Sequence, residues 1–242
     1  MTYCVGLLLN EGMVMLSDTR TNAGLDNIAT YRKMFIFENP GERCFVILTA
    51  GSLSVTQTTI ARLHEAMDQP DASSETSVML APTMLKVAEM IGNTLAGVRR
   101  EVDEKLASMN QSASASMIVA GQRKGGGMRM FLIYPEGNFI EATEDTPFLQ
   151  IGEHKYGKPI LDRVVRPTTT LLDAQKAVLV SMDSTLRSNL SVGMPLDLAV
   201  MEKDALKVTM RRRIEAGDEG FAAMSRAWSQ ALRAGFDEIA MF

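Results

Sequence analysis

The chain has 242 residues, of which 46% are hydrophobic and 22% charged, with a formal net charge of -4. This composition is typical of a globular protein with a sizeable core, and the net negative charge does not favour nucleic-acid binding. No apolar run approaches the ~18 residues that cross a bilayer, and no signal peptide is recognisable. Cys4 and Cys44 lie in apolar segments and are expected to be buried free thiols. The predicted location is therefore cytoplasmic.

The first half of the chain predicts strands followed by two long helices. Residues 2–9 alternate in polarity, and the turn Asn10-Glu11-Gly12 leads into an antiparallel partner. Two later segments keep apolar residues at helical spacing. We expect strands over 2–9, 13–18, 32–37 and 44–50, a loop over 21–30, and helices over 54–67 and 81–106.

The second half returns to strands before two further helices. Thr170 and Asp173 have the spacing of a capping box, which predicts a helix start, and Gly235 is expected to stop the last helix. We expect strands over 116–123, 128–134, 139–143, 148–152, 197–202 and 205–213, and helices over 170–188 and 218–234. Helices that cover two facing sheets form an α+β, four-layer αββα sandwich, and no linker divides residues 1–242, which predicts a single domain.

The second residue offers unusual chemistry. If Met1 is removed, Thr2 carries both a hydroxyl nucleophile and a free α-amine that can act as its base. Protein α-amines have pKa values of about 7.7–8.0, so a useful fraction is unprotonated near neutral pH. The pattern therefore indicates an N-terminal nucleophile.

Three other residues can support that nucleophile. Lys33 would keep the amine unprotonated through like-charge repulsion and would stabilise a developing alkoxide. Asp18, at the end of the second strand, would hold the lysine, because a buried ammonium without a partner is costly. Gly51, at a strand-to-helix junction, can present its backbone N–H to an oxyanion.

Metal and cofactor chemistry find little support in the sequence. His64 and His154 are the two histidines, and no cysteine pair has the spacing of a zinc site. The chain has no Gly-x-Ser-x-Gly elbow, and Gly125-Gly126-Gly127 lacks the Lys-Ser/Thr of a phosphate-binding loop. We expect neither a metal nor a cofactor.

Several short motifs carry a family resemblance. They are Thr2-Tyr3-Cys4-Val5-Gly6-Leu7-Leu8-Leu9, Ser17-Asp18-Thr19-Arg20, Thr21-Asn22-Ala23-Gly24, Arg32-Lys33-Met34, Ala50-Gly51 and Gln150-Ile151-Gly152-Glu153-His154-Lys155-Tyr156-Gly157-Lys158-Pro159. Together they resemble the proteasome-type threonine hydrolases, and the longer match is similar to the bacterial Anbu group (ancestral β-subunit). The resemblance covers essentially the whole chain. It implies the fold of N-terminal-nucleophile hydrolases, amide-bond hydrolysis, and assembly of copies into rings or spirals.

The resemblance also assigns site residues. It implies that Thr2 is the nucleophile, that Asp18 and Lys33 are the supporting pair, and that Gly51 is the oxyanion donor. Arg20 matches a residue that braces the site. Residues that would line the substrate pocket, which favours apolar or mixed side chains, are Thr21, Tyr31 and Phe35.

Two positions depart from the proteasome pattern. Glu153 stands where proteasome β-subunits carry a serine, and Ser188 replaces the aspartate of their Asp-x-x-Ser-Gly motif, whereas Ser191 matches its serine. These supporting residues tune the threonine amine, so the departures are consistent with weak or substrate-restricted activity.

Alternative functions remain open at this stage. The bacterial two-ring protease that works with a separate unfoldase (HslV) shares the same chemistry. A non-catalytic ring or spiral scaffold would keep the fold alone, and an acyl-enzyme resolved by an amine would transfer amides. The chain has no motor, so a folded protein substrate would require a separate ATPase or accessory enzyme.

Overall fold

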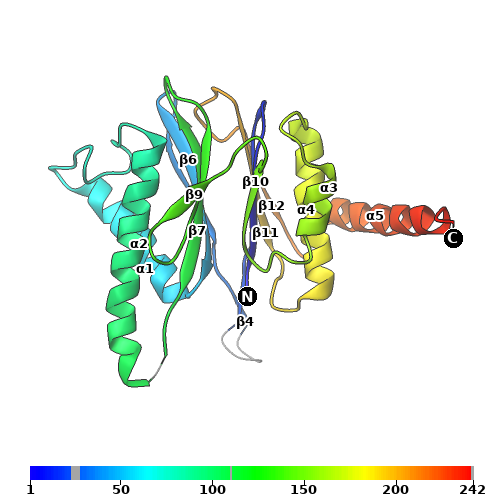
Figure 1. Cartoon of the computed structure of the whole chain (residues 1–242), viewed down its shortest axis with the longest axis horizontal. Helices are drawn as coiled ribbons and strands as arrows, with labels where there is room; N and C mark the ends of the chain where they lie inside the picture. Colours follow the sequence, from blue (N-terminus) through cyan, green and yellow to red (C-terminus); the bar gives the residue numbers. More distant parts are fainter. Residues whose placement is uncertain (23–27, 110, 241–242) are drawn as a thin grey trace.

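The computed structural model describes residues 1–22, 28–109 and 111–240. Within these ranges two antiparallel sheets lie face to face, and helices flank both outer faces (Figure 1). This is the α+β sandwich that the sequence predicted. The chain begins between the two sheets, at one end of the sandwich, and its last helix projects away from the sandwich.

The first sheet contains the start of the chain. Its strands, in spatial order, are β10 (Phe148–Gly152), β1 (Tyr3–Leu8), β2 (Gly12–Asp18), β11 (Leu196–Glu202) and β12 (Met210–Ile214). The register pairs Cys4 with Ser17, so the beginning of β1 lies beside the end of β2. The alternation in β1 turns Tyr3 and Val5 toward α3 and α4 and Cys4 toward the facing sheet.

The second sheet consists of strands from the middle of the chain. They are, in spatial order, β5 (Met34–Asn39), β6 (Arg43–Gly51), β7 (Ala115–Arg123), β8 (Arg129–Ile133) and β9 (Phe139–Glu141). In β6, Phe45 and Ile47 face the helices, whereas Val46 and Leu48 face the first sheet. Both faces of the strand are buried, which explains its almost wholly apolar sequence.

The helices cover the sheets in two pairs. They are α1 (Leu53–Asp68) and α2 (Met84–Leu106), followed by the short 3₁₀ turn η1 (Ala107–Met109), on the second sheet, and α3 (Lys158–Val164) and α4 (Leu171–Ser188) on the first. Thr83 caps α2 by accepting from the Lys86 N–H at 3.0 Å. Thr170 caps α4 by accepting from the Asp173 N–H at 3.2 Å, as the sequence predicted.

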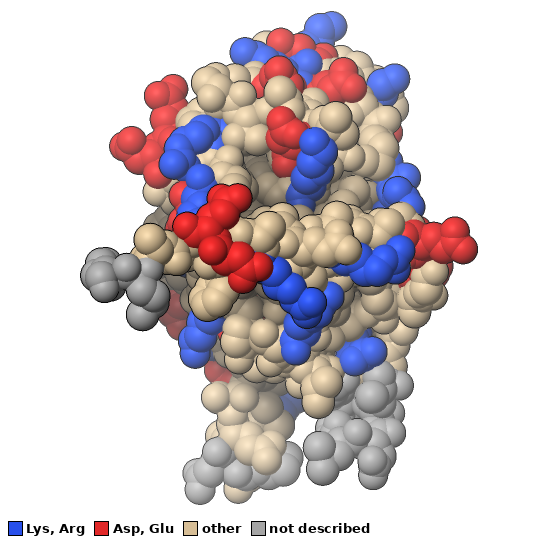
Figure 2. Space-filling model, turned by 90° about the vertical axis from the view of Figure 1, so that its right-hand side faces the viewer, with Lys and Arg blue, Asp and Glu red and all other residues tan. Residues whose placement is uncertain are grey.

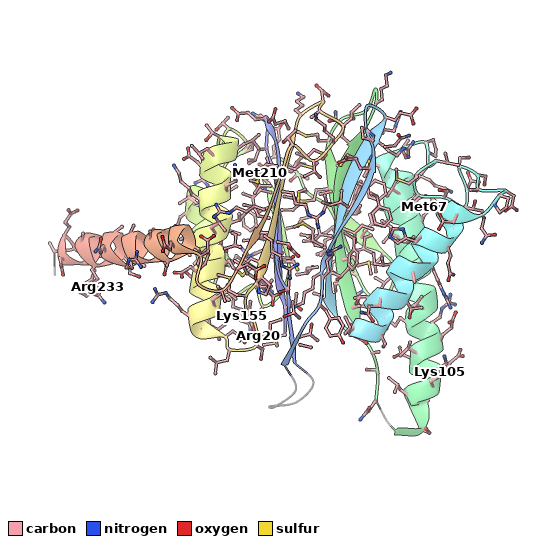
Figure 3. The ribbon with its side chains drawn as sticks, turned by 180° about the vertical axis from the view of Figure 1, so that it is seen from behind. Arg20, Met67, Lys105, Lys155, Met210 and Arg233 are labelled. Carbon is pink, nitrogen blue, oxygen red and sulfur yellow. The ribbon has the colours of Figure 1, made fainter. Side chains whose placement is uncertain are left out.

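Side chains fill the molecule in three apolar layers, one beneath each helix pair and one between the sheets (Figure 3). The middle layer contains the sulfur-bearing residues Cys4, Met13, Met15 and Cys44. Both cysteines are free and buried. No described helix combines the length and apolarity required to cross a bilayer.

Two expectations for strands were wrong in detail. The expected loop over 21–30 instead contributes β3 (Arg20–Asn22) and β4 (Ile28–Thr30), which pair with each other, while residues 23–27 lie outside the described part. The strand expected over 205–213 begins only at Met210. Asp204 and Leu206 have φ values of 62° and 50°, a left-handed conformation that interrupts a strand.

Two expectations for helices also need correction. The sequence did not predict α3, although Pro159 in its first turn is a favourable helix start. The last helix, α5 (Glu219–Asp237), continues through Gly235 instead of stopping there. A glycine within a helix costs only ~1 kcal/mol, so it does not by itself end one.

Candidate active site

The register of the first two strands places Asp18 beside the start of β1. The Tyr3 N–H donates to Asp18 Oδ1 at 3.1 Å, and Thr2, the preceding residue, is 8% exposed. Asp18 itself is fully buried. The Asp18 carboxylate therefore binds the backbone of the residue that directly follows Thr2, the predicted nucleophile.

Lys33 reaches the same carboxylate from the start of β5. Its ammonium donates to Asp18 Oδ1 at 2.8 Å and to the Arg20 carbonyl at 2.5 Å. Its backbone is fixed as well, because the Thr49 N–H of β6 donates to the Lys33 carbonyl at 2.9 Å. Lys33 is 5% exposed, so this ion pair is shielded from water and from salt.

The Asp18 carboxyl is the electrostatic centre of the site. Burial raises its pKa, and the Lys33 ammonium and the N–H groups of Tyr3 and Gly193 act against that rise. The Gly193 N–H donates to Asp18 Oδ2 at 3.3 Å, so both carboxylate oxygens have donors. Removing one of these donors would leave the Asp18 carboxylate partly unpaired in the apolar interior, which is costly.

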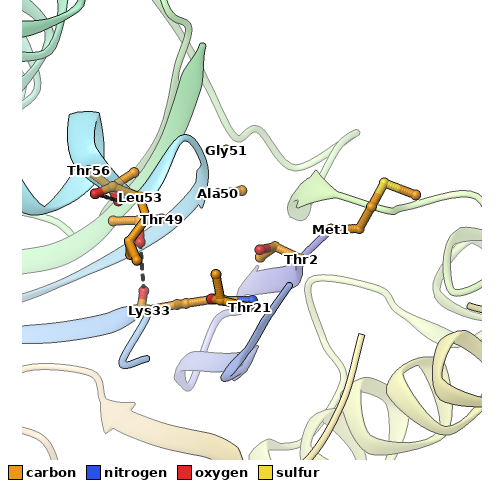
Figure 4. Close-up of a pocket in the computed structure, with 9 residues that line it drawn as sticks. All are labelled: Met1, Thr2, Thr21, Lys33, Thr49, Ala50, Gly51, Leu53 and Thr56. Carbon is orange, nitrogen blue, oxygen red and sulfur yellow. Dashed lines mark hydrogen bonds between the residues drawn. The ribbon is translucent and has the colours of Figure 1, made fainter. Parts of the chain in front are cut away.

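A cavity of about 290 Å³ opens between the chain start and the end of β6 (Figure 4). Thr2 and Gly51 lie on opposite sides of it, and Lys33 extends toward Thr2 and Thr21. Its lining comes from Met1, Thr2, Thr21, Lys33, Thr49, Ala50, Gly51, Leu53 and Thr56. The four residues predicted as catalytic therefore meet here: three line the cavity, and the fourth, Asp18, binds Lys33.

Gly51 has the conformation that the sequence argument required. Its φ of 107° is strained for any other residue, and a Cβ there would lie 2.3 Å from the Ser114 carbonyl oxygen. The bare backbone at this position borders the cavity directly opposite the chain start. Gly51 is thus placed to present its main chain to a bound substrate.

The residues predicted to line a substrate pocket are distributed differently. Thr21 borders the cavity, whereas Tyr31 and Phe35 are not among its described lining residues. Phe35 pairs with Ile47 and packs in the layer beneath α1 and α2. Tyr31 is 39% exposed.

The end of β10 holds the chain start in place. The Glu153 N–H donates to the Thr2 carbonyl at 2.6 Å. Gly152 has a φ of 83°, and a Cβ there would lie 2.0 Å from the same carbonyl oxygen. The close approach of these two backbones requires glycine, a contribution that sequence reasoning missed even though Ile151-Gly152 was part of the family resemblance.

A turn after α4 closes the far side of the site. The Arg20 guanidinium donates to the Leu190 carbonyl at 3.0 Å, and Gly193 leaves room for it, because a Cβ there would lie 2.2 Å from Arg20 Nε. The contact holds Arg20 against this turn, and the bracing role expected of it stays a prediction. Figure 3 shows Arg20 at one end of the sandwich. Gly193 was not predicted as a site residue. It binds Asp18 and borders Arg20, and the Ser191-Val192-Gly193 sequence was its only signal.

The remaining supporting residues lie around this turn. The Glu153 carboxylate accepts from Asn189 Nδ2 at 3.3 Å, and Asn189 Oδ1 accepts from the Ser191 N–H at 2.9 Å. Ser188 is exposed at the end of α4. Asn189, which the sequence analysis did not select, links Glu153 to the turn.

Cys4 lies close to these groups without competing as a nucleophile. Its thiol donates to the Thr49 carbonyl at 3.6 Å and is fully buried. Burial raises the pKa of this thiol well above its ordinary range, so it stays protonated. The described residues also contain no cluster of His, Cys, Asp and Glu that could hold a metal ion.

Comparisons with known proteins decide the family. The model described as "Proteasome subunit" matches residues 2–201. The structure of Anbu (Gly-1) mutant from Hyphomicrobium sp. strain MC1 is 49% identical, with 100% of this chain and 99% of that chain covered and a TM-score of 0.93. This chain belongs to the Anbu group of the proteasome subunit family. No curated protein matches it.

Two further Anbu structures show the same agreement over full length. Anbu from Yersinia bercovieri is 41% identical, with coverage of 100% and 99% and a TM-score of 0.92. The helical assembly of the Anbu complex from Pseudomonas aeruginosa contains a chain that is 45% identical, with coverage of 100% and 98% and a TM-score of 0.92. The family resemblance read from the sequence is thereby confirmed.

Proposed function

We propose that this Anbu chain, once Met1 is removed, hydrolyses peptide or other amide bonds through an acyl-enzyme on Thr2. One observation carries the proposal: Thr2 and Lys33 line one cavity, and the Lys33 ammonium is bound to the buried Asp18 carboxylate at 2.8 Å. The ammonium of this lysine, paired with Asp18, borders the same cavity as the chain start. That charge disfavours protonation of the neighbouring α-amine and favours an alkoxide.

The reaction follows from these groups. Thr2 Oγ attacks the amide carbonyl, and the Thr2 α-amine accepts the hydroxyl proton. The C–N bond breaks, the amine returns this proton to the leaving nitrogen, and an ester to Thr2 remains. The α-amine then takes a proton from a water molecule, whose oxygen attacks the ester carbonyl. The C–O bond to Thr2 breaks, the amine returns the proton to Thr2 Oγ, and the carboxylic acid is released. The backbone N–H of Gly51 would stabilise the oxyanion in both steps. One such hydrogen bond lowers the activation free energy by roughly 3–4 kcal/mol in other hydrolases.

Other residues position the reacting groups in this proposal. Arg20 braces the turn that binds Asp18, and Glu153 fixes the Thr2 carbonyl through its backbone. Ser188 and Ser191 flank the turn as supporting residues. Of the expected pocket residues, Thr21 lines the cavity, while Tyr31 and Phe35 would contribute from outside its described lining. The pocket would take apolar or mixed side chains, because no carboxylate among the described lining residues would pair with a cationic one.

Removal of Met1 is the activating step. Met1 is 62% exposed, whereas Thr2 is buried. An aminopeptidase can therefore reach the first peptide bond, and a small second residue suits such an enzyme. Until that bond is cut, the nitrogen of Thr2 belongs to an amide and cannot act as a base.

Assembly completes the proposal. The Pseudomonas aeruginosa relative was solved as a helical assembly of the Anbu complex. We extend homo-oligomerisation, as a ring or an open helical array, to this chain, with a separate ATPase or accessory enzyme delivering any folded substrate. The two buried free cysteines accord with a reducing, cytoplasmic setting.

Covalent labelling tests the mechanism directly. Protein purified from its native host is weighed intact to establish loss of Met1, and is then incubated with an electrophile that must bond both the threonine oxygen and its α-amine. We expect one adduct per subunit, none in Thr2→Ala, and an unchanged adduct in Thr56→Ala, which alters a cavity hydroxyl without touching the nucleophile. Labelling of Thr2→Ala would overturn the proposal.

The scaffold function is a second candidate that one observation favours. The Glu153 carboxylate accepts from Asn189 Nδ2 and Ser188 is exposed, so neither side chain is described in contact with Thr2. Persistence of Met1 on every copy would establish the scaffold. An added primary amine distinguishes amide transfer from hydrolysis: the amine is incorporated into the product in the first reaction and not in the second. Dependence of substrate turnover on a partner unfoldase would instead favour an HslV-like peptidase.

A further inference from the structure

Threonines form much of the wall of the cavity at the chain start. Apart from the nucleophile, three of them line it from three different elements: Thr21 of β3, Thr49 of β6 and Thr56 of α1. Ala50 and Leu53 provide apolar surface beside them. Ligand pockets are usually lined by apolar side chains with a few polar groups that determine which ligand is bound. The hydroxyls of this cavity should therefore decide which side chain it accepts.

Thr49 carries a buried hydroxyl with a poor hydrogen-bond partner. The residue is 3% exposed, and its hydroxyl donates, among the described residues, only to the Lys33 carbonyl at 3.5 Å, the limit of such a bond. That carbonyl already accepts from the Thr49 N–H at 2.9 Å. The Thr56 hydroxyl, by contrast, donates to the Leu53 carbonyl of its own helix at 3.1 Å. Because a buried hydroxyl without a good partner is costly, Thr49 is suited to bond a group that enters the cavity.

The position of Thr49 in β6 sets the length of side chain that can reach it. Gly51, the proposed oxyanion donor, lies two residues further along β6, so both positions belong to the side of the strand on which Phe45 and Ile47 face the helices. Two residues of a strand span about 6.6 Å. Both Gly51 and Thr49 line the cavity. A substrate held at Gly51 therefore needs a side chain as long as glutamine or methionine to reach the Thr49 hydroxyl, and alanine is too short.

The charge inside the cavity favours a neutral side chain. Lys33 is the one charged side chain in the described lining, and its ammonium is already paired with Asp18. A substrate ammonium would meet a like charge, and a substrate carboxylate would lose water without gaining an uncommitted cation. The outer surface differs, since Figure 2 shows basic and acidic side chains intermingled over the α5 end of the molecule. A neutral polar group is therefore the best match for the Thr49 hydroxyl.

We propose that the cavity selects a glutamine side chain on the acyl side of the cleaved bond. Its methylene groups would pack on Ala50 and Leu53, its amide carbonyl would accept from the Thr49 hydroxyl, and its amide N–H would donate to the Thr21 hydroxyl oxygen. Methionine has a similar length, but its thioether sulfur is only a weak acceptor. The inference rests on the hydrolase proposed above and narrows its substrate class to peptides cleaved after glutamine. Thr49 is then a specificity-determining residue that takes no part in bond cleavage.

Matched electrophiles test this selectivity. Protein without Met1 is treated with peptide epoxyketones that differ only in the side chain next to the reactive ketone: glutamine, methionine, glutamate or alanine. An epoxyketone bonds both Thr2 Oγ and the α-amine, and intact mass gives the rate constant of modification. We expect the glutamine reagent to react roughly tenfold faster than the methionine and glutamate reagents, the gain from about one buried hydrogen bond. Equal rates for glutamine and methionine, with the alanine reagent still reacting, would overturn this inference and leave the hydrolase standing.

Variants at two buried threonines identify the selecting hydroxyl. Thr49→Val keeps the shape of the side chain and should bring the glutamine and methionine rates together, whereas Thr49→Ser should retain the preference. The control Thr59→Val removes a hydroxyl that donates to the Val55 carbonyl at 2.7 Å outside the described cavity lining, and should leave the ratio of rates unchanged. A preference for glutamine that survives in Thr49→Val would contradict the role of this hydroxyl.

Binding without chemistry separates this inference from the proposed hydrolase. In Thr2→Ala, which lacks the nucleophile, a peptide that ends in glutamine should still bind roughly tenfold more tightly than its methionine counterpart in calorimetry. Failure of every electrophile to modify Thr2 would overturn the hydrolase, and the ratio of affinities would then decide the preference of the cavity. Equal affinities for the two peptides would overturn that preference.

Discussion

The two ends of this chain are built in opposite ways. At the start, Thr2 is almost fully buried and its carbonyl, its neighbour's N–H and the carboxylate beneath it all have partners within the chain. At the end, α5 extends into solvent with Leu232 and Phe236 exposed. The start is therefore specified by the chain's own contacts, whereas the end presents apolar side chains that the described residues of the chain leave exposed. Perturbing each end should have very different effects on the isolated subunit.

The largest loss should follow removal of the buried ammonium. Lys33→Ala leaves the Asp18 carboxylate in the interior without its cationic partner, which should lower the free energy of unfolding by about 3–5 kcal/mol. Chemical denaturation measures this, and labelling of Thr2 should disappear in the same variant.

An exposed pair supplies the control for Lys33. Lys158→Ala breaks the ion pair with Asp162, whose side chains are 50% and 47% exposed, and should cost roughly 0–1 kcal/mol because solvent screens it. Similar losses in both variants would contradict the view that burial makes the pair at the chain start essential.

Crowding at the chain start can be separated from backbone strain. Gly152→Ala should lower stability by about 3 kcal/mol and displace Thr2, because the new Cβ meets the Thr2 carbonyl oxygen. Gly41→Ala has nearly the same φ, 82° against 83°, but no atom within 4 Å, and should cost only about 1–2 kcal/mol. Thermal unfolding and Thr2 labelling check both, and an active, equally stable Gly152→Ala would refute the close approach.

A pH titration examines the buried phenol next to Thr2. Burial raises the pKa of Tyr3 to about 12, while its hydroxyl bonds Ser181 at 2.6 Å. The unfolded phenol ionises near pH 10, so folding stability should fall as the pH rises from about 10 to 12. The loss should reach about 2–3 kcal/mol. Urea unfolding at increasing pH measures the slope, and Tyr3→Phe should remove this part of it. An identical slope in Tyr3→Phe would assign the loss to other groups.

The smallest effect is expected at the other end. Truncation after Ala231 removes residues that are all exposed over 232–240 and should change the stability of the isolated subunit by less than about 0.5 kcal/mol. A large loss in the dilute subunit would show that α5 belongs to the core of its own chain.

The sequence predicted most of the fold and the centre of the site because both follow local rules. Alternation placed Asp18 at the end of a hairpin strand, and the glycine at position 51 followed a buried strand. The family resemblance supplied the grouping of Thr2, Asp18 and Lys33. The predicted bounds were wrong for the strand expected over 205–213, which left-handed residues interrupt, and for α5, which continues through Gly235.

The contributions that escaped prediction are mostly backbone contacts between distant segments. Gly152 and Gly193 act by leaving space for Thr2 and Arg20, and Asn189 acts by joining two loops. Such contacts have no sequence period and appear only when the chain is folded. Sequence periodicity does not predict the orientation of α5 either. It shows which face of a helix is apolar but not which surface covers that face.

Asp18 ties together three separate parts of the chain: β1 through Tyr3, β5 through Lys33, and the turn at Gly193. A subunit that abandoned hydrolysis altogether would still need this carboxylate to fold. Retention of Asp18 and Lys33 in a related chain would therefore be explained by structure alone and would not by itself indicate an active threonine.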